Sequence, residues 1–105
     1  MYRKRYTDTT DTHMRADYDK VVNAVAEAMD LTTSQVVSKR KYQETTEARR
    51  IVVYILREMG YCSNRIAIWM GMTSRNVNLI LSSMNYRIHR EKQLRTILES
   101  ARKYL

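Results

Sequence analysis

Apolar residues recur at helical spacing over most of the chain, and the clearest run ends just before Gly60. The positions follow one another at intervals of three and four residues, which places them on one face of a helix. They are Ala48, Ile51, Val52, Ile55, Leu56 and Met59. Glycine is a common residue directly after a helix, so Gly60 is suited to end it. The pattern predicts a helix over about 46–59 with one buried face.

The same spacing predicts five more helices, joined by short connections. They are a helix from Ala16 or Asp17 to about Met29, a short helix capped by Thr32 or Thr33, two helices at about 63–70 and 74–87, and a last helix within 90–105. Residues 1–15 are polar and show no apolar period, so we expect a mobile tail there. The expected domain is therefore 16–105, an all-α fold of about six helices.

Two of these helices carry further apolar positions that we expect to face the core. The short helix contributes Val36 and Val37. The last helix presents an apolar face of Leu94, Ile97, Leu98, Ala101 and Leu105. Its simplest role is to close the core against the first helix, because an amphipathic helix buries its apolar face.

The fourth and fifth predicted helices are separated by a corner at Gly71. We expect Ser63 to cap the fourth helix and Thr73 or Ser74 to cap the fifth. Ala67, four residues before the glycine, allows close approach of the helices, and Val77, six residues after it, fills the inside of the angle. This spacing is typical of a DNA-binding helix-turn-helix, here over about 63–87, although an ordinary helical hairpin can also turn at a glycine.

The fifth helix would then show polar side chains to solvent on its first turns. We expect Ser74, Arg75, Asn76 and Asn78 to contact base edges. Arginine can bind guanine through two hydrogen bonds and asparagine can bind adenine in the same way. The alternative is that the asparagines are simply exposed polar residues.

Composition and charge agree with a helical protein that binds a polyanion. The 105 residues include no proline and two glycines, so little interrupts helices, and the length suits one domain. The net charge is +8, and it is concentrated in residues 39–105, where fourteen basic and five acidic side chains give +9. Such a field attracts nucleic acid, although a solvated cationic surface is the simpler alternative.

The stretch from Val22 to Ile88 resembles the C-terminal, origin-box-binding domain of the bacterial replication initiator DnaA, a fold similar to the Trp repressor. The similarity runs through "VAEAMDLTTSQVVSKRK", through "EARRIVVYILREM" and through the predicted helix-turn-helix. The resemblance implies that Lys41 stands where the family has an arginine that enters the minor groove, and that Arg49 touches the DNA backbone. Basic side chains at such positions suit phosphates.

The full set of side chains that we expect to hold the DNA backbone is basic apart from one threonine. It consists of Lys39, Arg40, Lys41, Arg49, Arg50, Arg65 and Thr73. The residues expected to contact bases differ from those of the family, which has Asp-His-Thr-Thr where this chain has Thr73 to Asn76. The departure implies a DNA target other than the initiator box. Two glycines also leave no Gly-rich phosphate loop, so we expect no ATPase module.

We expect no enzymatic activity, no cofactor and no metal site. His13, Cys62 and His89 have no metal-ligand spacing, and Glu44 with Glu47 suits a helix N-terminus. The chain has no apolar run long enough to span a membrane and no signal-like start, so we expect a cytoplasmic protein at the nucleoid.

The expected function is sequence-specific binding of double-stranded DNA in regulation or replication. A homodimer and a replication or transcription protein partner stay open. The alternatives are a helical protein-interaction module, suggested by the basic amphipathic last helix, and a non-specific nucleic-acid binder.

Overall fold

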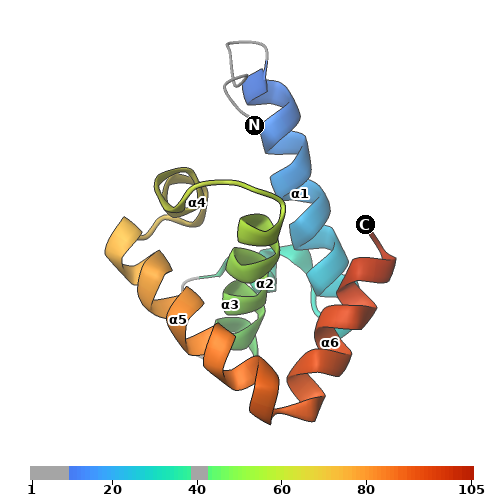
Figure 1. Ribbon diagram of the computed structural model, residues 1–105. Helices are drawn as coiled ribbons and strands as arrows, with labels where there is room; N and C mark the ends of the chain where they lie inside the picture. Colours follow the sequence, from blue (N-terminus) through green and yellow to red (C-terminus); the bar gives the residue numbers. More distant parts are fainter. Residues whose placement is uncertain (1–9, 39–42) are drawn as a thin grey trace.

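The structure is a computed structural model that describes the backbone of residues 10–38 and 43–105 (Figure 1). These residues form helices and connections without a strand, which confirms the all-α prediction. The helices are α1 (Thr10–Met29), α2 (Thr33–Val37), α3 (Gln43–Glu58), α4 (Ser63–Met70), α5 (Ser74–Arg90) and α6 (Lys92–Lys103).

Helix α3 forms the centre of the fold and contacts α1, α2, α4 and α5 (Figure 1). Its predicted core positions are buried up to Leu56, and Val53 is buried with them. Around it, α6 packs along α1, and α5 joins α6 at an open angle. The core therefore lies between α3 and the surrounding helices, and α5 keeps one side toward solvent.

Helix α1 begins earlier than the sequence pattern predicted. It starts at Thr10, whereas the apolar period starts only after Ala16, so residues 10–15 are helical and the predicted tail is too long there. The first turns project beyond the other helices (Figure 1), where a helix needs no apolar face. The remainder of the predicted tail, residues 1–9, lies outside the described residues.

Three expected core residues are exposed, for local reasons. Val37 is 43% exposed because neighbours on a helix point about 100° apart, and Val36 takes the inward direction. Met59 is 42% exposed because α3 ends at Glu58 and the chain turns away. Leu105 is 48% exposed because it lies beyond the end of α6.

An aromatic cluster holds α4 against α1. The ring of Trp69 lies 5.5 Å from that of Tyr18 and 5.1 Å from that of Tyr61, measured between centroids. The Tyr61 hydroxyl donates a hydrogen bond to the Asp17 carboxylate. Because Tyr18 and Asp17 belong to α1, this cluster fixes the first helix of the helix-turn-helix on the body of the domain.

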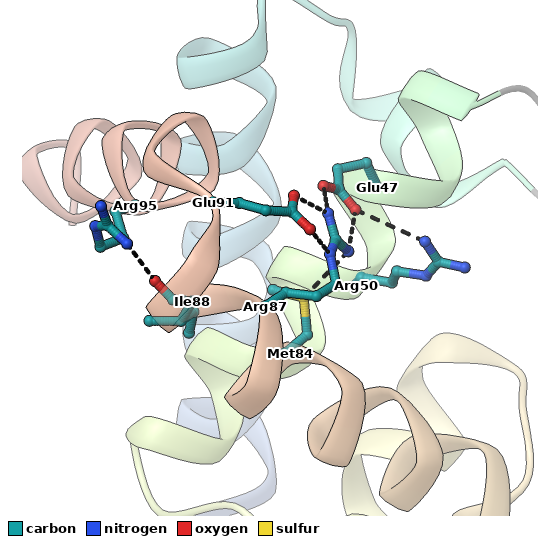
Figure 2. Close-up of polar contacts among 7 residues, drawn as sticks. All are labelled: Glu47, Arg50, Met84, Arg87, Ile88, Glu91 and Arg95. Carbon is teal, nitrogen blue, oxygen red and sulfur yellow. Dashed lines mark hydrogen bonds and ion pairs between the residues drawn. The ribbon is translucent and has the colours of Figure 1, made fainter.

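The other end of the helix-turn-helix is fixed by Arg87 near the C-terminus of α5 (Figure 2). Its guanidinium binds Glu47 of α3, with Nη1 2.8 Å from Oε1. It also donates to both carboxylate oxygens of Glu91, at 2.8 and 2.9 Å. Glu91 is the single residue between α5 and α6, so Arg87 ties three helices together.

Candidate nucleic-acid interface

The corner between α4 and α5 is built around Gly71, as predicted. Its backbone is left-handed, with φ 68° and ψ 37°, a conformation that a side chain disfavours. The Met72 amide donates to the Ala67 carbonyl at 3.0 Å, which closes the end of α4. Ala67 is 5% exposed and Val77 is fully buried, so both fill the inside of the angle. Figure 1 shows α4 end-on beside α5, so the two helices cross steeply.

Helix α5 starts with a side-chain cap, whereas α4 does not. The Thr73 hydroxyl accepts a hydrogen bond from the Asn76 amide at 3.0 Å, which confirms one of the two predicted caps. The predicted cap at Ser63 is wrong. Cys62 occupies the position before α4 and makes no side-chain cap, because α4 already includes Ser63.

The Ser63 hydroxyl has a different partner, across the corner. It donates to Asn78 Oδ1 at 2.6 Å. In the same way, the Ser74 hydroxyl donates to the side-chain oxygen Oδ1 of Asn64. These two hydrogen bonds join the start of α4 to the first turns of α5. Two of the four predicted base-contacting side chains, Ser74 and Asn78, therefore already hold α5 on α4.

The other two predicted base-contacting side chains are available to solvent. Arg75 and Asn76 are both exposed on the first turn of α5. Arg75 makes no hydrogen bond or ion pair with any described residue, and the side-chain amide of Asn76 makes only a weak contact with the Met72 sulfur at 3.6 Å. Their donors and acceptors are therefore free for a ligand.

Two basic residues of α3 lie beside this first turn. Arg49 and Arg50 border a surface cavity of about 310 Å³ whose lining also includes Gly71 and Asn76. The Arg49 Nε atom is buried and has no hydrogen-bond partner among the described residues. Arg50 is more exposed and lies 3.8 Å from Glu47. The structure thus brings Arg49, Arg50 and Asn76 together around one cavity.

The remaining predicted backbone-binding residues are placed differently. Arg65 lies on α4, with its guanidinium 5.9 Å from the centre of the Trp69 ring. It is separate from the cavity that Arg49 and Arg50 line. Lys39, Arg40 and Lys41 lie outside the described residues.

The charge around α4 and α5 is entirely positive in sequence. No aspartate or glutamate occurs between Met59 and Arg90. Arg87 is the one cation of α5 that is compensated, since hydrogen bonds to Glu91 and Glu47 raise its pKa, and Arg87 in turn lowers the pKa of Glu91. The outward side of α5 therefore has no acidic residue of its own to oppose an anion.

Sequence reasoning missed one residue of this surface. Leu79 is 60% exposed and lies one helical turn after Arg75. The interval of four residues was the available signal, because side chains four apart share a helix face. The inward positions Val77 and Met84 are fully buried, so Leu79 and Arg75 lie on the opposite side of α5.

Metal sites and membrane-spanning helices were also sought in the part of the chain that the structure describes. No group of three or more histidine, cysteine or acidic residues is placed to hold a metal ion within 10–38 and 43–105. Over the same residues, no helix has the length and apolarity needed to cross a membrane. The predicted lack of enzymatic activity stays a prediction.

Fold and site together define a small all-α domain with a helix-turn-helix and a basic outer surface. The chain is 28% identical, over 82 residues, to the chromosomal replication initiator protein DnaA of Aliarcobacter butzleri strain RM4018. The matched region covers 76% of this chain and 19% of the relative, so the chain corresponds to about a fifth of that protein's length. No protein-family model matches the chain. The similarity supports a DnaA-like helical domain and is compatible with DNA binding.

Proposed function

We propose that the protein binds double-stranded DNA in a sequence-specific manner, with α5 in the major groove. The observation that carries the proposal is the corner at Gly71, which presents exposed Arg75 and Asn76 on the first turn of a helix held by its neighbours. In DNA-binding helix-turn-helix proteins, the N-terminal residues of the second helix contact base edges. Arg75 and Asn76 have the side-chain types that bind guanine and adenine.

Ser74 and Asn78 remain in the proposed base-reading set, in a second role. Their hydrogen bonds to Asn64 and Ser63 set the position of α5 before DNA arrives. Each side chain keeps further capacity, since the Asn78 amide can donate and the Ser74 oxygen can accept. We propose that they contact bases at the edge of the site without losing their links to α4.

The proposed phosphate contacts begin with Arg49 and Arg50. Both side chains border the cavity next to Asn76, where basic groups suit a phosphate, and the buried Arg49 Nε has no partner among the described residues. The remaining members of the proposed backbone set are Lys39, Arg40, Lys41, Arg65 and Thr73. Lys41 is proposed to reach the minor groove, following the resemblance to DnaA.

A regulatory or replication-accessory role is our further proposal, supported by the similarity to part of a replication initiator. It includes no catalysis and no cofactor, and it places the protein in the cytoplasm at the nucleoid. A homodimer would require half-sites about one helical turn of DNA apart, roughly 34 to 36 Å.

The test is a selection of bound sequences from random duplexes, carried out at two salt concentrations. The proposal expects one enriched sequence at both concentrations, with affinity that falls as salt rises. Salt-sensitive binding without enrichment would reduce the function to non-specific nucleic-acid binding. If no duplex is retained at the lower salt concentration, DNA is not the ligand, and the protein-interaction alternative takes its place.

A further inference from the structure

The outward side of α5 combines a charged residue with an apolar one. Arg75 is exposed, and Leu79, one turn further along, is 60% exposed. The apolar residues of α5 that pack on the core are Val77, Ile80, Leu81, Met84 and Ile88, and Leu79 is not among them. A single exposed leucine is ordinary on a protein surface. Leu79 is of interest because it lies one helical turn after Arg75, on the face of α5 opposite the core.

The surroundings of Leu79 favour DNA over a protein partner as its ligand. The segment from Met59 to Arg90 contains no acidic residue, so the face that carries Leu79 is complementary to a polyanion. Tyr86, the other large exposed hydrophobic residue of α5, has the Arg90 guanidinium 4.9 Å from its ring centre. This side of α5 thus carries the exposed cations Arg75 and Arg90 and one uncovered aliphatic side chain, with no acidic residue.

The major groove offers one apolar feature that an aliphatic side chain can recognise, the C5-methyl group of thymine. We infer that Leu79 is a specificity-determining residue that packs on a thymine methyl group beside the base contacted by Arg75. This inference rests on the proposed function, because it requires α5 to lie in the major groove. It adds a fifth base-reading position to Ser74, Arg75, Asn76 and Asn78.

Helix geometry limits where that thymine lies. Four residues advance a helix by about 6 Å, and successive base pairs are about 3.4 Å apart. The thymine contacted by Leu79 therefore lies within about two base pairs of the guanine contacted by Arg75. Arg75 and Leu79, one turn apart, would therefore contact a guanine and a thymine that lie close together in the DNA sequence.

The experiment replaces thymine by deoxyuridine at one position at a time in the selected duplex. This change removes only the C5-methyl group and keeps every base-pair hydrogen bond. Burial of one methyl group corresponds to roughly a fourfold change in Kd. We expect the wild-type protein to lose about that factor at one thymine, and Leu79→Ala to bind the thymine duplex more weakly and to show no difference there.

The matched control is Ile68→Ala. Ile68 is 71% exposed, on α4 instead of α5, so the variant removes a similar amount of exposed aliphatic surface. It should keep the full difference between thymine and deoxyuridine. Both exposed positions should tolerate alanine, and equal melting temperatures with the wild type would verify that the variants are folded.

The outcomes separate the inference from the proposed function. If wild-type protein selects a sequence but tolerates deoxyuridine everywhere, or if Leu79→Ala keeps the difference, the inference is wrong and the proposed function stands. If the coupled thymine lies far from the position relaxed by Arg75→Ala, the assignment of Leu79 fails as well. Binding without any sequence preference overturns both.

Discussion

The link between α3 and the end of α5 can be tested by Glu47→Gln. The substitution keeps the shape of the side chain and removes its charge. Glu47 Oε1 can be retained as an acceptor for Arg87 Nη1, now 2.8 Å away, but the second oxygen becomes an amide that faces another donor. Arg87 keeps its two hydrogen bonds to Glu91, so the change acts mainly on the contact between α3 and α5. The longer pair of Glu47 with the exposed Arg50, at 3.8 Å, is also lost, but an exposed pair contributes little.

The expected loss follows from burial and geometry. The side chains of Arg87 and Glu47 are 20% and 19% exposed, so water screens the pair incompletely. A hydrogen bond to a charged group contributes about 1.5 to 3 kcal/mol. Because Glu91 still pairs with Arg87, we take the lower part of that range and expect a loss of about 2 kcal/mol. For a domain of this size, that loss lowers Tm by roughly 8 to 16 °C.

The assay is thermal unfolding followed by circular dichroism, with Glu58→Gln as the matched control. Glu58 pairs with Arg102 at 2.6 Å, but the two side chains are 38% and 46% exposed. An exposed pair contributes about 0.5 kcal/mol, so the control should lower Tm by only about 2 to 4 °C. Equal shifts in the two variants would refute the argument that burial of the Arg87 contact fixes α5.

The remaining predictions concern the proposed DNA contacts of Arg75 and Arg49, the corner at Gly71, and the pH dependence of stability. Arg75→Ala should weaken binding to the selected duplex by roughly 1 to 3 kcal/mol and relax preference at one base pair, measured by competition binding. Arg49→Met should lower affinity for all sequences and reduce the salt slope by about 1, measured by titration over several salt concentrations. Gly71→Ala should lower the free energy of unfolding by roughly 1 to 2 kcal/mol, measured in urea, because its backbone is left-handed. The pKa of Glu91 is held below its ordinary value of 4.5 in the folded protein, so stability from its charge is present above that pH and lost as pH falls through the folded pKa. The Tm difference between wild type and Glu91→Gln should therefore shrink in acid.

Each of these has a result that contradicts it. Full discrimination among sites by Arg75→Ala would show that α5 does not have the proposed recognition role. An unchanged salt slope in Arg49→Met would mean that this arginine neutralises no phosphate. A Gly71→Ala variant as stable as wild type would show that the corner adjusts to a side chain. A Tm difference for Glu91→Gln that is constant into acid would separate its charge from stability.

Local patterns explain why the corner was predictable. Ala67, Gly71 and Val77 lie within eleven residues, and each has a role set by its own size or backbone freedom. The start of α1 at Thr10 was not predictable, since residues 10–15 carry no apolar period. An apolar period marks the part of a helix that packs, and a projecting part needs none.

Contacts between distant residues were beyond sequence reasoning. Arg87 and Glu47 are 40 positions apart, and many other pairs of charges would fit the sequence equally well. Ser63 had the right side chain for a cap, but its hydroxyl bonds to Asn78 across the corner. The burial of the Arg49 Nε, which has no partner among the described residues, also depends on the three-dimensional fold. The phosphate role of Arg49 stays a prediction.

In helix α5, the residues that pack on the core are separate from those that face solvent, and this separation has an evolutionary consequence. Val77 and Met84 hold the fold, whereas Arg75, Asn76 and Leu79 face solvent. Substitutions at exposed positions usually change stability by no more than about 0.5 kcal/mol. A lineage could therefore exchange the outward residues freely and acquire a new target without compensating changes inside. Under the proposed function, the same property makes the domain a scaffold whose DNA preference could be reprogrammed by varying a few outward positions.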